Sequence, residues 1–215
     1  MEIGLESIVQ RNGHIVAVWR DVTIMWGGIS KYNDSYDPTE ILCHQDGVWT
    51  KKTTAGQLPP DVHSCSAQVV DDDLYLLCGF NSGTKEQYFS DYSNDVFKLD
   101  LNSWTWKILQ PTGTRPLKSG DSASWLFGKK IFLFGGSGKE KEEGTWYPEN
   151  LEVEPPIVRR SNNQLVYYDC QDNSWNWPIT RGAIPSPRYG HGQGAFSVRI
   201  PDEDGGSHRC RALEK

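Results

Sequence analysis

Cysteine and histidine, the side chains most able to bind metals or act as nucleophiles, do not cluster in this 215-residue sequence. The cysteines are odd in number, lie far apart and form no C-x-x-C pair; they are Cys43, Cys65, Cys78, Cys170 and Cys210. Disulfide frameworks and zinc sites need closer, paired spacing. His44 and His63 likewise have no neighbouring ligands that would complete a metal site. We therefore expect reduced thiols, no bound metal, and a cytoplasmic or nuclear location.

Catalytic motifs are missing as well. The sequence contains neither a nucleophile elbow nor an HExxH motif. Residues 135–139 read Gly-Gly-Ser-Gly-Lys, but the upstream glycine of a phosphate-binding loop is absent and no helix is expected to follow. His14 and His191 are expected to bond to neighbouring backbone rather than to catalyse a reaction. The sequence thus predicts a protein that is not an enzyme and needs no cofactor.

Aromatic side chains in polar segments, together with one arginine, are better candidates for a functional site. Exposed aromatic residues often anchor a partner protein, and arginine binds carboxylates. The alternative for each aromatic residue is packing against a neighbouring sheet, and for the arginine it is a bond between adjacent sheets. The candidates for partner binding are Tyr32, Tyr36, Phe80, Trp146, Tyr147 and Arg188.

The elements that would position these residues are short strands that end on glycine. Three hydrophobic segments have this form: residues 22–28, 74–79 and 130–136. Their last glycines are 51 and 57 residues apart. Glycine permits the positive φ that a sharp turn after a buried strand needs. The glycines expected to make these turns are Gly27, Gly28, Gly79, Gly135 and Gly136.

A tryptophan follows each glycine turn and forms a second repeated feature. Each tryptophan stands seven positions after an apolar or aromatic residue: the pairs are Leu42 and Trp49, Leu99 and Trp106, and Tyr168 and Trp175. The tryptophans are 57 and 69 residues apart, and a longer loop at 137–161 explains the longer interval. We expect each to cover the outer layer of a sheet, where truncation of a buried tryptophan costs about 3–5 kcal/mol.

A period near 50 residues that combines a glycine pair with a downstream tryptophan resembles the kelch repeat. Each kelch repeat is one four-stranded blade of a β-propeller. The resemblance implies an all-β fold in which residues 1–196 form an incomplete propeller of about three blades plus the start of a fourth. The expected blades are residues 11–58, 59–114 and 115–182, with the fourth beginning at 183–196. Residues 197–215 lose the pattern and are expected to form an irregular tail.

Composition and charge agree with this fold and exclude other classes. Aromatic residues make up 12% of the chain, and 21 glycines and 12 prolines favour many short strands. Helical periodicity is not sustained anywhere. The formal net charge of −6 gives no basic field for nucleic acid. The apolar runs fall far short of the roughly 20 residues of a membrane span, and the N-terminus lacks a signal region.

The order of the motifs resembles, more narrowly, the small kelch domain-containing proteins that serve as substrate receptors of cullin-2 RING ubiquitin ligases. The segments that carry this resemblance are residues 11–14, residues 64–67, the long insertion in the third repeat and residues 177–188. It covers about residues 11–190, the N-terminal half of such a protein. It implies a partner whose extreme C-terminus binds in a central pocket, and elongin and cullin-2 as partners of the full-length relatives.

The same resemblance implies that some features are missing here. In the relatives, the arginines of the pocket come from the fourth blade and beyond. Of the residues that follow the glycine turns, Ile29, Phe80 and Ser137, only Phe80 is aromatic. The C-terminal box that docks the relatives onto elongin and cullin is absent, so we expect impaired or absent ligase function.

Three blades leave open edges, which closed propellers of 4–8 blades do not have. A truncated product, such as a splice form, a fragment or a reading frame shifted after Ala195, explains these edges. The alternative is self-association, in which another copy pairs with the open blade edges. Two other functional outcomes stay open: a kelch scaffold that binds cytoskeletal or nuclear partners without a ubiquitin link, and an unstable by-product without function.

Overall fold

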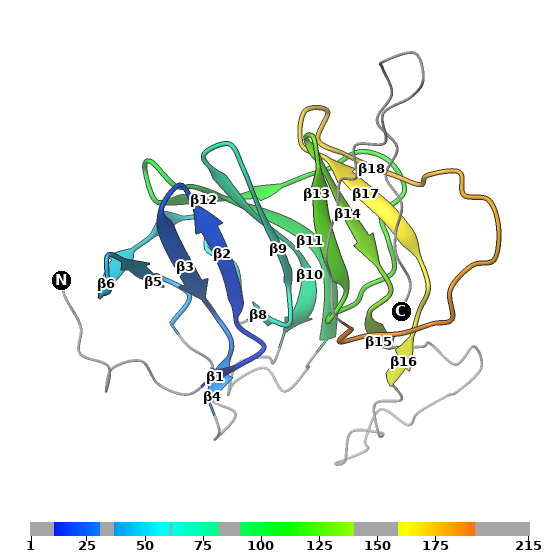
Figure 1. Ribbon diagram of the computed structural model, residues 1–215, viewed down its shortest axis with the longest axis horizontal. Helices are drawn as coiled ribbons and strands as arrows, with labels where there is room; N and C mark the ends of the chain where they lie inside the picture. Colours follow the sequence, from blue (N-terminus) through cyan, green and yellow to red (C-terminus); the bar gives the residue numbers. More distant parts are fainter. Residues whose placement is uncertain (1–10, 31–36, 61, 82–90, 140–158, 192–215) are drawn as a thin grey trace, which may run out of the picture.

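The computed structural model of the chain describes residues 11–30, 37–60, 62–81, 91–139 and 159–191. Within these residues every regular element is a β-strand, and none of them forms a helix with the length and apolar character needed to pass through a bilayer. Three antiparallel sheets, each built on four strands, stand side by side in chain order (Figure 1). The predicted all-β fold is confirmed, and the three sheets are the blades of an incomplete propeller.

The first blade contains four strands that pair in chain order: β2 (Ile15–Trp19), β3 (Val22–Trp26), β5 (Glu40–Gln45) and β6 (Val48–Thr53). Asp46 and Gly47 connect β5 to β6 with φ angles of 50° and 80°. Two successive residues with positive φ are the requirement of a type I′ turn, whose twist fits a hairpin. This Asp-Gly turn sets a register in which His44 is opposite Trp49.

The second blade has the same plan: β9 (Ser66–Val70), β10 (Asp73–Asn81), β11 (Asp91–Asp100) and β12 (Thr105–Leu109). Two short strands extend it, since β7 (Ala55–Gly56) runs parallel to β12 and β8 (Val62–His63) pairs with the end of β10. A four-residue turn joins β11 to β12. The Asp100 carboxylate stabilises this turn by accepting backbone N–H groups of Asn102 and Ser103 at 2.9 and 2.8 Å.

The third blade contains β13 (Ala123–Phe127), β14 (Lys130–Phe134), β17 (Leu165–Asp169) and β18 (Ser174–Asn176). Asp169 repeats the role of Asp100, because its carboxylate accepts the backbone N–H groups of Gln171 and Asp172. Short pairs flank the outer blades: β15 (Ser137–Lys139) with β16 (Arg159–Ser161) in the third, and β1 (Arg11–Asn12) with β4 (Ile29–Ser30) in the first.

The apolar core lies between the blades rather than within any one of them. Side chains alternate between the two faces of a strand, and β10 of the middle blade uses both faces. Leu74 and Leu76 join the cluster shared with the first blade, whereas Tyr75 and Leu77 join the cluster shared with the third. All four are buried. A continuous apolar run is therefore what a middle blade requires.

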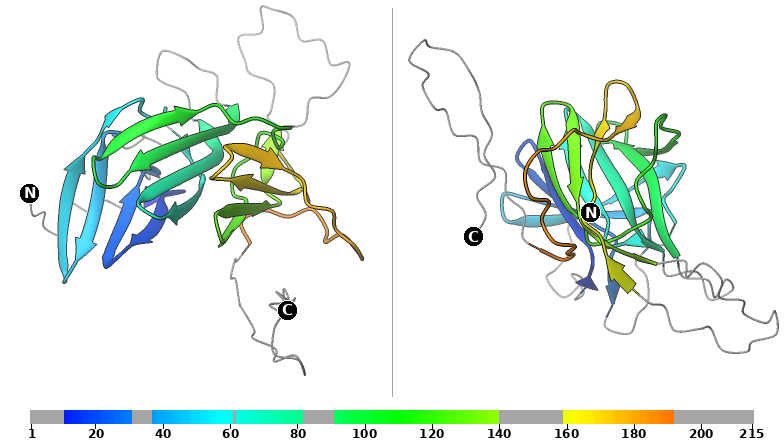
Figure 2. Two further views of the ribbon diagram at one scale, coloured as in Figure 1. Left: turned by 90° about the horizontal axis from the view of Figure 1, so that it is seen from above. Right: turned by 90° about the vertical axis from the view of Figure 1, so that its right-hand side faces the viewer.

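Each cluster brings a tryptophan of one blade against the preceding blade. Trp106 lies in the first cluster with its ring centroid 5.5 Å from that of Trp26. Trp175 lies in the second cluster beside Tyr168, with ring centroids 5.4 Å apart. Seen from above, the blades fan out one after another (Figure 2), with the inner strand β9 in contact with both β2 and β13. The predicted tail at 197–215 lies outside the described residues.

Candidate functional site

The three glycine turns share one backbone geometry. The two turn residues have φ angles of 66° and 93° at Gly27 and Gly28, and of 68° and 107° at Gly135 and Gly136. In the second blade the pair has φ angles of 61° at Cys78 and 118° at Gly79. The left-handed conformation is thus conserved through all three repeats, although Cys78 places a side chain where the other repeats have glycine.

These turns require glycine because other backbone comes close. A Cβ on Gly28 would lie 2.8 Å from the Asn12 carbonyl oxygen, and one on Gly136 would lie 3.0 Å from the Gly120 carbonyl oxygen. The turns also hydrogen-bond to the chain that leads into the next blade. The N–H of Gly79 donates to the Ser119 carbonyl at 2.7 Å, and that of Gly136 donates to the Arg188 carbonyl at 2.8 Å.

We name the four stretches that precede the inner strand of each repeat the lead-in segments: residues 11–14, 62–65, 119–122 and 188–191. One residue of each has φ between 56° and 67°, namely Gly13, Ser64, Asp121 and Gly190. Ser64 N–H donates to the Gly13 carbonyl at 2.7 Å, Asp121 N–H to Ser64 at 2.9 Å, and Gly190 N–H to Asp121 at 3.0 Å. A ladder of backbone hydrogen bonds therefore crosses all three blades at one end of the molecule.

The lead-in segments and the glycine turns together form the glycine-turn face. The strand ends that flank residues 31–36, 82–90 and 140–158 belong to β4, β10, β11, β15 and β16, and these pair with the lead-in segments or extend from the glycine turns. They lie together at the lower edge of Figure 1. The candidates Tyr32, Tyr36, Trp146 and Tyr147 fall in two of these intervening segments, outside the described residues.

Phe80 lies at this face but within packed side chains. Its ring centroid is 5.1 Å from that of His63 and 4.9 Å from that of Tyr92, and 8% of its surface is exposed. The Tyr92 hydroxyl in turn is 3.3 Å from the Ser137 hydroxyl of the third blade. Phe80 therefore links the second lead-in segment to the glycine-turn end of β11.

Arg188 is exposed and connects to its surroundings in two ways. Its backbone bonds across to the third blade, because its N–H donates to the Asn162 carbonyl at 3.1 Å and its carbonyl accepts from Gly136. Its guanidinium donates to the carbonyl and the hydroxyl of Ser186, both at 3.1 Å. Burial lowers the pKa of the neighbouring His191, and the charge of Arg188 lowers it further.

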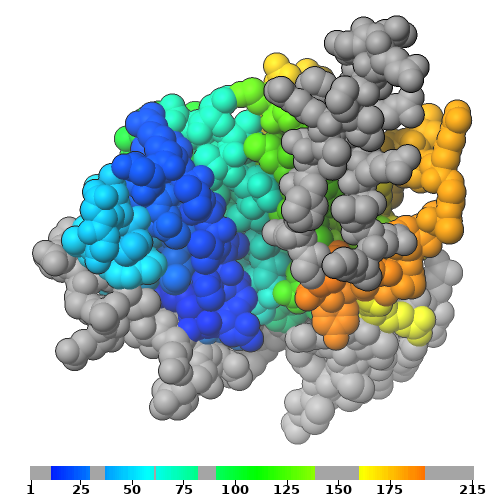
Figure 3. Space-filling view, viewed as in Figure 1, coloured from blue at the N-terminus to red at the C-terminus, as the bar shows by residue number. Residues whose placement is uncertain are grey.

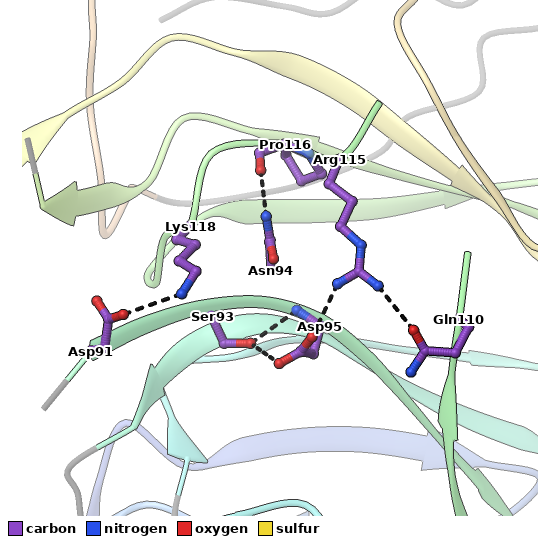
Figure 4. A network of polar contacts seen from close by, with 8 residues as sticks. All are labelled: Asp91, Ser93, Asn94, Asp95, Gln110, Arg115, Pro116 and Lys118. Atoms are coloured by element: carbon purple, nitrogen blue, oxygen red, sulfur yellow. Dashed lines mark hydrogen bonds and ion pairs between the residues drawn. The ribbon is translucent and has the colours of Figure 1, made fainter. Parts of the chain in front are cut away.

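A network of ionic and polar contacts fixes the linker that leads into the third blade (Figure 4). Arg115 donates to Asp95 at 3.1 Å and to Gln110 at 3.4 Å, and Lys118 contacts Asp91 at 3.2 Å. Asn94 adds an amide bond of 2.8 Å to the carbonyl of Pro116. Since Asp91, Asn94 and Asp95 belong to β11, this network ties the linker to the second blade.

The three repeated tryptophans differ in burial. Trp106 is 0% exposed and Trp175 is 2% exposed, whereas Trp49 is half-buried against His44, with ring centroids 4.9 Å apart. The seven-residue spacing before each tryptophan also corresponds to different cross-strand pairs. Trp106 is opposite Leu99 and Trp175 is opposite Tyr168, but Trp49 is opposite His44 because the turn before it is two residues shorter.

Comparison with known proteins agrees with this geometry. The KLHDC2/KLHL20/DRC7 Kelch-repeats domain matches residues 13–199. The chain belongs to the kelch-repeat family.

Named kelch proteins match most of this chain. Kelch domain-containing protein 2 of Homo sapiens is 28% identical over 198 residues, which cover 85% of this chain and 47% of that protein. Host cell factor 2 of Homo sapiens is 28% identical over 191 residues, covering 84% of this chain and 22% of that protein. The chain thus spans about half the length of the Kelch domain-containing protein 2 sequences that it matches.

The packing role of two linker glycines in this kelch chain was not predicted from the sequence. Gly56 and Gly113, in the linkers between blades, contact the outer strands of the second and third blades. A Cβ on either glycine would collide with the carbonyl oxygen of Trp106 or Trp175. The signal was present in the sequence, since a glycine follows each outer strand at the same repeat position, with Gly182 the third.

The side chains of His14, Cys65 and Cys78 at the glycine-turn face of this kelch chain are at least partly buried and have shifted pKa values. Burial raises the pKa of the Cys65 thiol and raises that of Cys78 to about 12, so neither is a ready nucleophile. Burial and the charge of Arg11 lower the pKa of His14. The described part of the chain contains no group of three His, Cys, Asp or Glu residues that could hold a metal ion. Arg188 places an exposed guanidinium at this face.

Proposed function

We propose that this chain is a non-catalytic protein-binding module that holds its partner on the glycine-turn face. The observation that supports this proposal is the ladder of backbone hydrogen bonds from Gly13 to Gly190. This ladder aligns the lead-in segments of successive blades at one end of the molecule. The strand ends that flank residues 31–36, 82–90 and 140–158 lie at that same end. Segments held by a rigid sheet scaffold are common binding surfaces, and kelch relatives support a protein-interaction role.

This proposal is tested by photocrosslinking at two exposed asparagines. Asn12 lies on the glycine-turn face, and Asn102 lies in the turn between β11 and β12 at the opposite end. A photoreactive residue at position 12 is expected to capture a defined partner in cells, whereas the same residue at position 102 captures it weakly. Equal capture at both positions, or capture at 102 alone, would place the binding surface elsewhere.

We propose, more specifically, that the partner is a substrate protein and that this chain binds its C-terminus, as a substrate receptor of a cullin-2 RING ubiquitin ligase does. The motif order of residues 11–190 supports this class. The exposed guanidinium of Arg188, held beside the third glycine turn, is a suitable partner for a terminal carboxylate.

Two peptides that differ only at the C-terminus test whether the chain binds a terminal carboxylate. A fluorescent peptide ending in Gly-Gly with a free carboxylate should bind about tenfold more tightly than its amidated form, because a charge-assisted bond is lost in the amide. Arg188→Gln should remove that difference. Arg20→Gln is the matched control, because Arg20 pairs with Asp72 at the opposite end of the blades. Equal binding of acid and amide would contradict the finer proposal, and a partner recovered without cullin-2 from the longer protein would favour the scaffold alternative.

A further inference from the structure

At each of the two interfaces between neighbouring blades, a tryptophan packs beside a glycine of the linker that precedes its blade. In the first, Gly56 has φ of 91°, its β7 pairs with β12 beside Trp106, and the Trp106 indole N–H donates to the Thr54 hydroxyl at 3.1 Å. In the second, Gly113 has φ of 81° and Thr112 forms a parallel bridge with Ser174, next to Trp175. The linker glycine lets an outer strand and its tryptophan come within backbone contact.

A third linker presents the same glycine without a strand against it. Gly182 has φ of 90°, and no described atom lies within 4 Å of where its Cβ would be. Thr180 stands two positions earlier, as Thr54 stands before Gly56. The surrounding apolar side chains are exposed, with Ile179 at 97% and Ile184 at 67%. The linker segment, residues 177–187, is drawn in orange on the right side of Figure 3. No described strand packs against this linker, which has the geometry to receive an outer strand that carries a tryptophan.

The first blade presents the complementary surface. Trp49 occupies the second position of the outer strand β6, as Trp106 does in β12. Val16 and Val18 on β2 are 52% and 63% exposed, because no described blade precedes them. The blue and cyan atoms of this blade form the opposite end of the molecule from the orange linker (Figure 3). Within the described residues, the chain therefore carries both a tryptophan strand without a linker against it and a linker without a strand against it.

The lead-in segments at the two ends are also interchangeable in sequence. Residues 11–14 read Arg-Asn-Gly-His and residues 188–191 read Arg-Tyr-Gly-His, whereas the two middle lead-in segments share neither pattern. Gly13 and Gly190 have φ angles of 67° and 59°. Residues 11–14 of a second copy can therefore make the backbone bonds to Gly136, Asn162 and Asp121 that residues 188–191 make within the chain.

We propose that two copies of this chain associate with twofold symmetry, the first blade of each packing against the third blade of the other. Trp49 of one copy fills the Gly182 site of its partner, and residues 11–14 replace the partner's residues 188–191 at the third glycine turn. Three blades from each copy make six, within the range of closed propellers. Two identical contacts remove both open edges and complete the hydrogen-bond ladder of the glycine-turn face. This proposal does not rest on the proposed function, and in the dimer Arg11 of the second copy takes the position of Arg188 beside the third glycine turn.

The mass of the 215-residue chain in solution tests the proposal. Light scattering at rising protein concentration should show a shift from 24.3 kDa to twice that mass and then a plateau. A mass that stays at 24.3 kDa at all concentrations would overturn the proposal. Continued growth beyond the dimer would overturn the closed symmetry, because open chains of copies grow without limit.

Two variants and their controls locate the contact. Gly182→Val and Trp49→Ala should each weaken dimerisation at least about tenfold, a shift of about 1.4 kcal/mol. Gly128→Val matches the backbone strain of the first, since Gly128 has φ of 60° and open space around it. Ile108→Ala matches the second as an exposed apolar truncation on an outer strand. Controls that weaken the dimer as much as the two variants would contradict this assignment.

Mixing the two variants distinguishes the loss of the proposed contact from misfolding of the variants. A Trp49→Ala chain retains Gly182, and a Gly182→Val chain retains Trp49, so the mixed dimer has one intact contact of the two. The mixture should therefore dimerise more strongly than either variant alone. Variants that are misfolded, or that act elsewhere, would show no such gain, and that result would overturn the Trp49 to Gly182 contact.

Discussion

Blade faces that pack against a neighbouring blade and the blade face that does not differ in how deeply they bury the repeated tryptophan. Trp106 and Trp175 are almost fully buried between blades, whereas Trp49, at the same position of its outer strand, is half-buried and lies against His44. The linker glycines show the same contrast, since a Cβ on Gly113 would collide with the Trp175 carbonyl oxygen, whereas a Cβ on Gly182 would have no described atom within 4 Å. A repeat thus encodes a strand and its tryptophan, but burial of that tryptophan comes from the neighbouring blade.

The largest effect that this contrast predicts is at the linker glycines. Gly113→Val should lower the free energy of unfolding by about 4 kcal/mol or more, because its Cβ collides with the Trp175 carbonyl and its φ is positive. Gly182→Val has the same backbone strain without the collision and should cost about 1–2 kcal/mol. Urea unfolding of both variants measures the difference. Equal losses would mean that the linker is not packed against the outer strand.

The tryptophans provide the next comparison. Trp106→Ala should cost about 3–5 kcal/mol, since it opens a cavity between two blades and leaves the Thr54 hydroxyl without its indole partner. Trp49→Ala should cost about 1–2 kcal/mol, because this ring is only partly buried. Both values are to be measured by chemical denaturation at concentrations where the chain is monomeric. A Trp49→Ala loss as large as that of Trp106→Ala would show a cover over the first blade.

The thiols between the blades predict a smaller but specific effect. Burial raises the pKa of Cys43 to about 11 and those of Cys78 and Cys170 to about 12. Because the folded-state values are raised, the stability from these neutral thiols is complete below the ordinary value near 9 and is lost as the pH rises toward 12.

Peptide mapping after alkylation at pH 9 checks this prediction for each cysteine separately. A thiol with a pKa of about 12 is ionised to about one part in a thousand at that pH, so Cys78 should react at least about 100-fold more slowly than in the urea-unfolded chain. Similar rates in both states would mean that the space between the second and third blades is open to solvent.

The smallest effect concerns the linkers themselves. Arg115 and Leu58 stand at equivalent positions, two residues after Gly113 and Gly56. Arg115 pairs with the half-exposed Asp95, whereas Leu58 packs against the first core cluster. Arg115→Leu should therefore change the free energy of unfolding by less than about 1 kcal/mol. Leu58→Arg should cost about 1–2 kcal/mol by removing a partly buried apolar side chain. Thermal unfolding ranks the two, and a reversed order would contradict the packing of the first linker.

Much of the architecture was predictable because it depends on local chemistry. The apolar run of residues 74–78 predicted a buried strand, and the glycine turns predicted positive φ at Gly28, Gly79 and Gly136. The site was less predictable. Phe80 looks like an exposed loop residue in the sequence, and only the adjacent rings of His63 and Tyr92 show that it is packed. Its aromatic character alone carries no information about which neighbours reach it.

The sequence by itself determined the strands, their glycine turns and the number of repeats, because φ preference and the alternation of side chains act over a few residues. Only the tertiary structure decided that Trp49 is less covered than Trp106, that Gly182 is open where Gly113 is not, and that Arg188 bonds to the third blade through its backbone. Each of these outcomes depends on contacts between blades that lie tens of residues apart. Such contacts form or fail according to how whole sheets pack, which no short stretch of sequence specifies.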